Sequence, residues 1–151
     1  GPVKSWVYGV STLISLFHDV AIPAAVIALL GHYGQVEVDA NFVVALLVVM
    51  GFSVHDTIVV FDRVRENVGR MLAGLGEVVD ASVRQTLARS LATSFTLALV
   101  LVALLFGGPP SLYYFVLILL IGVISGAYSS IFVASPVLLA LSGGRRARKR
   151  T

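Results

Sequence analysis

The chain has 151 residues, of which 58% are hydrophobic and 13% are charged, whereas soluble domains carry about a quarter charged residues. This composition excludes an ordinary soluble domain and predicts an integral membrane protein. The sequence contains no cysteine, which excludes disulfides, structural thiolate–metal sites and thiol nucleophiles.

Four apolar stretches are each long enough to cross a bilayer as a helix, which predicts an all-α membrane bundle. They cover residues 6–30, 42–61, 90–106 and 112–141. Residues 62–89 are predicted to form a short cytoplasmic helical loop, broken at Gly74–Gly76. Residues 1–2 are interpreted as the remnant of an expression tag, residues 3–143 as one transmembrane domain, and residues 144–151 as a basic cytoplasmic tail.

The formal net charge is +3, and the eleven lysines and arginines are placed unevenly. All of them lie before the first stretch, between the second and third, or after the fourth. The positive-inside rule therefore predicts a multi-pass protein with both ends of this chain in the cytoplasm. Attraction of the basic tail to anionic lipid explains that tail more simply than binding to nucleic acid.

The first stretch carries polar side chains at helical spacing. Ser11, Ser15 and His18 share a face with Ile22, and Asp19 follows His18. Such a stripe must face protein or water rather than lipid. His18 and Asp19 are interpreted either as a mutually satisfied packing pair or as polar residues that support a proton relay.

The second stretch places a carboxylate deep in the membrane. At about 1.5 Å per residue from the start of the stretch, Asp56 lies about 21 Å into a hydrocarbon core about 30 Å thick. A carboxylate at that depth costs several kcal/mol unless it is paired, wetted or protonated, so its default interpretation is functional. Ser53 and Thr57 share its face, whereas His55 and Asp62 lie on a neighbouring face. Asp62 is interpreted mainly as a structural charge at the membrane exit.

The third stretch begins with a cation. Arg89 and Thr93 share one face, and Arg89 stands near the predicted inner boundary. Because Asp56 lies about 9 Å below that boundary, we predict an Asp56–Arg89 pair between neighbouring helices. The alternative is that Arg89 reaches lipid phosphate and only fixes the topology. Before this stretch, an apolar stripe around Val78 and Val79 is predicted to lie on the inner membrane surface.

The fourth stretch carries a stripe of small residues, which predicts a face for close helix packing. Its members are Gly122, Ser125, Gly126, Ser129 and Ser130. Pro136 is predicted to bend or end this span. We find no nucleophile–base pair, metal-ligand pattern or phosphate-binding loop in the sequence. The prediction is therefore a protein that is not an enzyme and that has no cofactor and no metal.

The most distinctive segments are GFSVHDTIVVFDRVREN at residues 51–67 and QTLARSLATS at residues 85–94. Together with FHDV at 17–20 and SSIFVAS at 129–135, they resemble the SecF proteins of the SecD/SecF protein-export family, within the resistance-nodulation-division superfamily. Family members have six spans and a large periplasmic domain between the first two. The resemblance therefore implies that this chain corresponds to the last four spans, and we expect that it does not couple protons to export alone.

The resemblance also implies a function in the bacterial inner membrane. It assigns proton conduction to Asp56 and Arg89, and it implies a SecDF complex that uses the proton-motive force to assist protein translocation through SecYEG on the outer side. The implied partners are SecD, SecYEG with SecA, YajC-type and YidC-type membrane proteins, the lipid bilayer, and exported polypeptide bound by the periplasmic domain. Many relatives have Asn where this chain has His55, which is interpreted as a polar substitute or an extra relay group.

Two alternatives remain open. The chain could belong to a proton-coupled exporter of small molecules or lipids from the same superfamily. It could instead be a non-transporting scaffold that positions SecD.

Overall fold

The computed structural model describes residues 3–34 and 36–142. The predicted tag remnant and basic tail lie outside the described residues. The elements are α1 (Ser5–His32), α2 (Ala40–Arg70), α3 (Leu75–Gly107), a 3-10 turn η1 (Pro110–Leu112), α4 (Tyr113–Ser129), a π-helical segment η2 (Ser130–Ala134) and α5 (Ser135–Leu141). Four helical units are long and apolar enough to cross a membrane, with η1 to α5 forming the last. The prediction of a four-span all-α bundle is confirmed.

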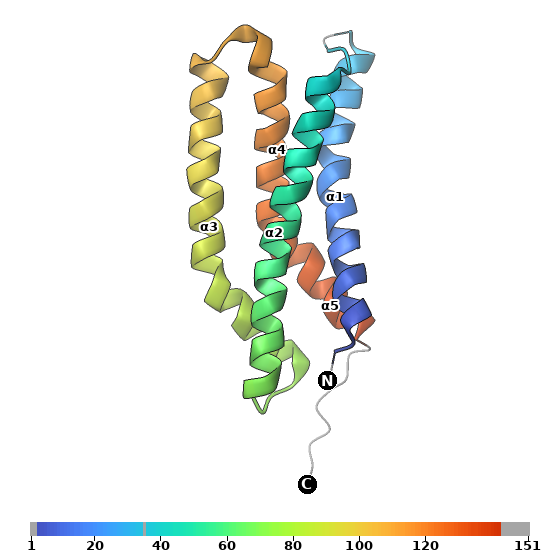
Figure 1. Cartoon of the computed structure of the whole chain (residues 1–151), viewed down its shortest axis with the longest axis vertical. Coiled ribbons are helices and arrows are strands. Elements are labelled where there is room, and N and C mark those ends of the chain that lie inside the picture. Colours follow the sequence, from blue (N-terminus) through green and yellow to red (C-terminus); the bar gives the residue numbers. More distant parts are fainter. Residues whose placement is uncertain (1–2, 35, 143–151) are drawn as a thin grey trace.

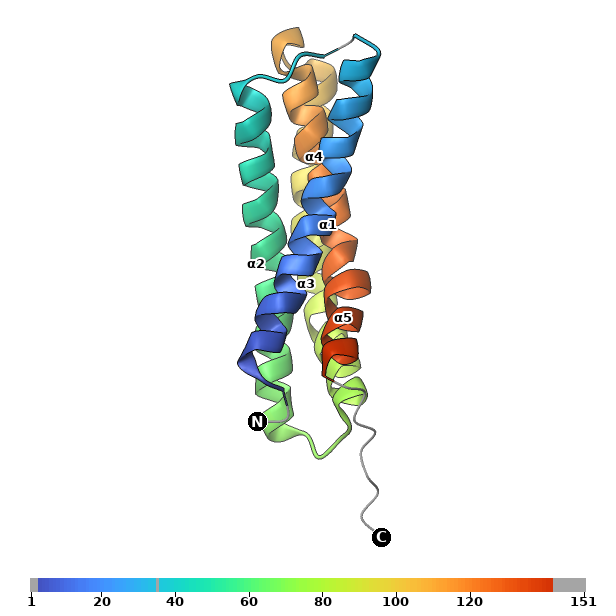
Figure 2. The same cartoon turned by 90° about the vertical axis from the view of Figure 1, so that its right-hand side faces the viewer.

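The four units run alternately up and down (Figure 1). The end at which α1 begins, α2 ends, α3 begins and α5 ends carries the lysines and arginines of the described chain, and we call it the basic end. Helices α2 and α4 pack extensively against each other. Helices α1 and α3 lie on opposite sides of that pair (Figures 1 and 2). The α2–α4 interface is therefore the centre of the bundle.

The predicted cytoplasmic loop is almost entirely helical. Helix α2 continues to Arg70 and α3 begins at Leu75, so only four residues separate them. The prediction that Val78 and Val79 lie on the membrane surface is wrong, because both are buried in a cluster with Val60 and Val64 of α2. Helix α2 keeps an apolar face after Asp62, where its charged residues begin. Helix α3 covers that face, so the face is not left to lipid.

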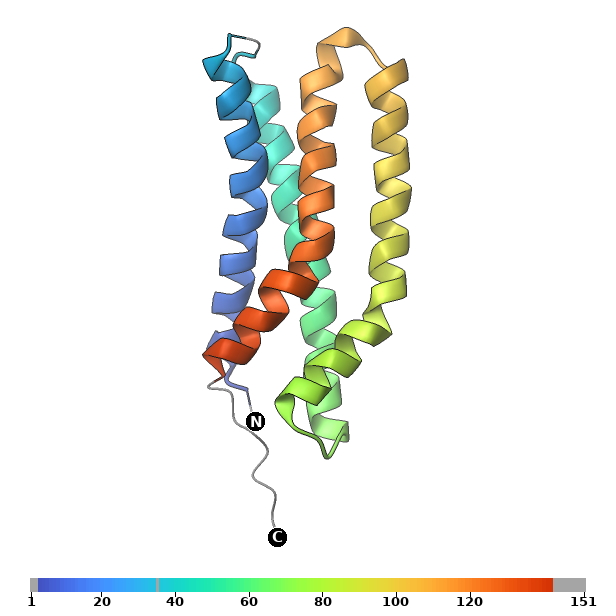
Figure 3. The same cartoon turned by 180° about the vertical axis from the view of Figure 1, so that it is seen from behind.

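A π-helical segment interrupts the fourth unit. The Ser135 hydroxyl donates to the Ser130 carbonyl at 2.8 Å, and Pro136, which has no backbone N–H, stands in the first turn of α5. Beyond this segment the chain turns aside and crosses towards α1 (Figure 3). The prediction of a bend near Pro136 agrees with this geometry. Single π turns of this kind occur frequently at functional sites.

Glycines set the spacing between α2 and α4. A Cβ atom added to Gly122 would lie 2.2 Å from Cγ2 of Val49, and one added to Gly126 would lie 3.2 Å from Cδ1 of Phe52. Backbones approach closely in membranes where such small residues line the contact. The predicted small-residue stripe is thus buried against α2 and aligns the two helices that hold the polar centre.

Candidate functional site

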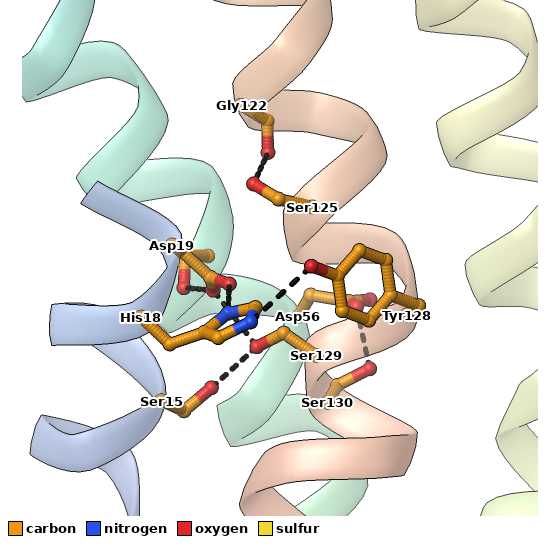
Figure 4. A network of polar contacts seen from close by, with 10 residues as sticks. Ser15, His18, Asp19, Asp56, Gly122, Ser125, Tyr128, Ser129 and Ser130 are labelled. Atoms are coloured by element: carbon orange, nitrogen blue, oxygen red, sulfur yellow. Dashed lines mark hydrogen bonds and ion pairs between the residues drawn. The ribbon is translucent and has the colours of Figure 1, made fainter. Parts of the chain in front are cut away.

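Two carboxylates are buried in the middle of the bundle (Figure 4). Asp19 of α1 is 0% exposed and Asp56 of α2 is 9% exposed. Neither makes an ion pair with a lysine or arginine among the described residues. Burying an uncompensated carboxylate costs several kcal/mol, so the groups that surround each oxygen determine what the site can do.

Asp56 is bound by one hydroxyl on each carboxylate oxygen. Ser90 of α3 donates to Oδ1 at 2.5 Å, and Ser130, the first residue of η2, donates to Oδ2 at 2.8 Å. The carboxylate thus links three helical units through neutral donors. Neutral donors compensate a buried charge less fully than a cation does. Protonation of Asp56 removes that charge while leaving both serines able to accept or donate.

Asp19 has a denser set of partners. The His18 ring Nδ1 lies 2.9 Å from Asp19 Oδ1, while Ser53 of α2 and Ser129 of α4 both donate to Oδ2, the latter at 2.9 Å. Ser15 contacts Ser129 at 2.6 Å between hydroxyl oxygens. The expected His18–Asp19 pair is therefore present, within a network that crosses three helices (Figure 4).

The histidine connects this network to the bundle surface. His18 is 30% exposed at its side chain, and its Nε2 lies 3.2 Å from the Tyr128 hydroxyl. The two rings also meet edge to face, with centroids 5.4 Å apart. A neutral imidazole that donates from Nδ1 to the carboxylate and accepts from tyrosine at Nε2 satisfies every contact.

The two carboxylate sites share the fourth helical unit and α2. On α4 and η2, consecutive residues serve the two sites, because Ser129 donates to Asp19 and Ser130 to Asp56. On α2, Ser53 binds Asp19 three residues before Asp56 itself. A change in the hydrogen bonds of one carboxylate therefore affects the helical segments that carry or bind the other carboxylate.

The predicted Asp56–Arg89 ion pair is absent from the described chain. Arg89 is exposed and lines a cavity of about 200 Å³ between α2 and α3 near the basic end, together with Asp62 and Glu66. The neighbouring residue, Ser90, occupies the position facing Asp56. Consecutive helical residues point about 100° apart, so the prediction missed the inward face of α3 by one residue.

The remaining predicted site residues fall into two groups. Thr57, the residue after Asp56, is also buried. His55, Asp62 and Thr93 are exposed, and the Thr93 hydroxyl donates to the Arg89 carbonyl at 2.9 Å. Among the described residues, no group of three or more histidine, cysteine or acidic side chains is placed to hold a metal ion.

Several members of the site were not predicted as carboxylate ligands. Ser129 and Ser130 are predicted only as members of a packing face, and the sequence predicts no contact for Ser90 or Tyr128. A signal for Ser90 does exist, because α3 carries a buried hydroxyl every fourth residue. The members of that period are Ser82, Thr86, Ser90 and Ser94. The Ser94 hydroxyl has no hydrogen-bond partner among the described residues.

Comparisons with known proteins agree on one family. Residues 4–144 match the model of a family described as protein export membrane protein SecD/SecF, C-terminal. The protein translocase subunit SecF of Thermobaculum terrenum is 51% identical over 133 residues, which cover 87% of this chain and 42% of the relative. SecF of Synechocystis is 49% identical over 129 residues, covering 85% of this chain and 41% of the relative.

A solved structure has the same fold. The crystal structure of SecDF in its super-membrane-facing form superimposes with a TM-score of 0.79 and 37% sequence identity, covering 93% of this chain and 19% of that chain. The chain spans about two fifths of the length of the SecF relatives that it matches.

Proposed function

The chain belongs to the SecD/SecF family of protein-export membrane proteins, and we propose that it is the proton-binding membrane part of a SecF-type translocase subunit. In this proposal the subunit acts with SecD, uses the proton-motive force, and assists translocation through SecYEG after SecA has begun it. YajC-type and YidC-type proteins are proposed as further neighbours. The basic end lies in the cytoplasm, which follows from the positive-inside rule.

The observation that carries the proposal is the setting of Asp56. It is a buried carboxylate in the middle of a membrane-spanning helix, and its oxygens accept from two serine hydroxyls and from no cation among the described residues. Ionisable groups in membrane spans mark ion and proton pathways. Proton uptake at Asp56 neutralises the site. Both carboxylate oxygens accept hydrogen bonds before protonation, whereas afterwards one oxygen donates and the other accepts.

The bonds that change connect α2 to two other helical units. Ser90 belongs to α3, and Ser130 begins the π-helical segment. A proton moving through the full membrane potential releases about 2.3 kcal/mol per 100 mV. That energy shifts a two-state arrangement by about 50-fold. One proton per cycle is therefore enough to drive a repacking of these helices.

Arg89 has a supporting role in the proposal. It faces the groove between α2 and α3 together with Asp62, one residue from the direct ligand of Asp56. We propose that Arg89 completes the relay in a second arrangement of α3.

The exporter alternative has less support from the cavities. A cavity of about 270 Å³ opens at the end opposite the basic end, between the loop after α1 and the start of α4. Its lining includes Glu37, Asp39 and Tyr114, none of which contacts Asp56. This cavity does not connect a substrate-sized space to the buried carboxylates.

Replacing Asp56 by Asn tests the proposal against the scaffold alternative. Export driven by an imposed proton gradient is measured in inverted membrane vesicles that contain the subunit with its partners, and assembly is checked by co-purification. We expect Asp56→Asn to abolish the gradient-dependent part of export while the complex remains assembled. Asp62→Asn, which neutralises an exposed carboxylate six residues further along the same helix, is the matched control and should retain export. Normal export by Asp56→Asn would leave only the scaffold function.

A further inference from the structure

We infer that Asp19 and His18 form a second proton-binding site in this bundle, coupled to Asp56 through the consecutive hydroxyls of Ser129 and Ser130. This inference extends the proposed proton-driven function by naming where the proton binds before or after Asp56. It does not depend on export, because it concerns the titration of this chain's own side chains.

The contacts of Asp19 exceed those of a packing pair. Its carboxylate is 0% exposed and yet receives three polar partners, namely His18, Ser53 and Ser129. The only ionisable partner among them, His18, is 30% exposed at its side chain. The histidine therefore joins a fully enclosed carboxylate to the side of the bundle. That side must face a protein partner or water rather than lipid, and a proton reaches Asp19 from there.

The proton transfer balances without any further reactant. A proton from outside the bundle binds Nε2 of neutral His18, so that Nε2 changes from accepting from the Tyr128 hydroxyl to donating to its oxygen. The imidazolium then passes its Nδ1 proton to Asp19 Oδ1 across the 2.9 Å contact. The products are a neutral imidazole that carries its proton on Nε2 and a neutral carboxylic acid, so the pair has taken up one proton.

The two carboxylates lie at different depths. Ser53 binds Asp19 and precedes Asp56 by three residues on α2, a rise of about 4.5 Å along the helix. Because α2 runs towards the basic end, Asp19 lies on the side of Asp56 away from that end. With the basic end in the cytoplasm, protons from outside the cell meet the Asp19 site first.

The coupling follows from shared helices and like charge. The titratable groups that surround Asp19 are His18 on α1, Asp56 on α2 and Tyr128 on α4, whereas η2 and α5, which also pack against α1, carry none. Two buried carboxylates disfavour each other's charged form. Their donors are consecutive residues of one helical unit, so neutralising one site changes both the charge and the hydroxyl orientation at the other.

Infrared titration of the full chain in lipid vesicles tests the inference. The protonated carboxylic acid has a C=O stretch separate from that of carboxylate, and aspartate labelled with ¹³C identifies it. We expect two buried carboxyl transitions, of which Asp19→Asn removes one and Asp56→Asn the other. In Asp56→Asn, the remaining transition should shift by about one pH unit, a tenfold change in proton affinity.

Histidine variants provide the matched control. His18→Gln should shift the Asp19 transition, whereas His55→Gln, which removes an exposed histidine beside Asp56, should leave it in place. The ¹⁵N shifts of the His18 ring in the unsubstituted chain give a second readout that requires no change at Asp19. They should move together with the Asp19 carbonyl band.

Three results would overturn the inference. They are a carboxyl band of Asp19 that never titrates, an Asp19 transition indifferent to the state of Asp56, and identical effects of the two histidine variants. Each leaves the export test on Asp56 unaffected, so the two proposals can fail separately.

Discussion

Replacing Gly122 by Ala is expected to force α2 and α4 apart. The added Cβ would lie 2.2 Å from Cγ2, 2.7 Å from Cγ1 and 3.0 Å from Cβ of Val49. Rotation of the valine cannot relieve this clash, because all three side-chain atoms are close and a β-branched residue in a helix is held near one rotamer. The backbones must separate until the nearest contact reaches the 3.4 Å at which ordinary van der Waals packing begins.

The cost follows from overpacking in a well-filled interface. Such insertions destabilise by about 1–3 kcal/mol, which lowers the ratio of folded to unfolded chain by about 5- to 150-fold. Two variants calibrate this value. A Cβ at Gly126 meets Phe52 at 3.2 Å, where a small movement of the ring gives relief, and a Cβ at Gly51 on α2 meets nothing within 4 Å.

Unfolding in mixed detergent micelles, followed by loss of helical circular dichroism, measures the three variants. We expect Gly122→Ala to be the least stable, Gly126→Ala to be intermediate, and Gly51→Ala to match or exceed the unsubstituted chain, because alanine favours helix over glycine. Adding Val49→Ala to Gly122→Ala should recover part of the loss, with a coupling of about 0.5–3 kcal/mol. Equal stability of Gly122→Ala and Gly51→Ala would refute the close α2–α4 contact.

Three further substitutions test other parts of the bundle. Ser90→Ala removes a donor to a buried carboxylate and should lower stability by about 1.5–3 kcal/mol in the same unfolding assay, whereas Ser94→Ala removes a buried hydroxyl that has no partner in the described chain and should be neutral or stabilising. Arg89→Gln should lower gradient-driven export in vesicles, while Arg84→Gln, which removes a cation from a surface pair with Asp80, should leave it unchanged. Val79→Asp places a charge in the cluster between α2 and α3 and should increase proteolysis near residues 71–74 in limited digestion. A digestion pattern like that of the unsubstituted chain would contradict the packing of this segment.

The hydropathy of the sequence alone was sufficient to predict the four-span helical architecture. Apolar runs of membrane length leave the backbone no alternative to helix, because every N–H and C=O must be satisfied within the segment. The place of Asp56 near the middle of the second helix could also be predicted, since it follows from a count along the apolar stretch. These predictions depend on covalent geometry and on the bilayer, and not on which helix lies beside which.

The hydrogen-bond partners of Asp56 could not be predicted from the sequence in the same way. Helix α3 carries two polar faces, one with Arg89 and Thr93 and the other with Ser90 and Ser94, and only the packing partners determine which of them turns inward. The prediction of an Asp56–Arg89 pair favours the cationic face, because charge compensates charge best in a low dielectric. The structure instead buries the smaller hydroxyls, which fit between closely packed helices, and leaves the guanidinium at the groove near the basic end.

The prediction that the stripe around Val78 and Val79 lies on the membrane surface is wrong for a related reason. An apolar stripe at helical spacing fits a membrane surface as well as it fits another helix. Val64 on α2 continues an apolar face among the charged residues that begin at Asp62, and this face indicates a protein partner. Whether the stripe packs on lipid or on protein depends on two segments together, and neither segment determines it by itself.

The position of the π-helical segment relates the packing to the proposed chemistry. On the side away from the basic end, Gly122 and Val49 hold α4 against α2 with no room for adjustment. At the level of the carboxylates, Ser129 and Ser130 hold the same helix by hydrogen bonds to Asp19 and Asp56, and in the proposed function these bonds change with protonation. Immediately beyond them the helix is already wound loosely, from Ser130 to Ala134. A packed interface is bistable rather than continuously deformable. Proton-linked movement should therefore be confined to η2, α5 and the adjoining half of α3, while the rest of the bundle remains fixed.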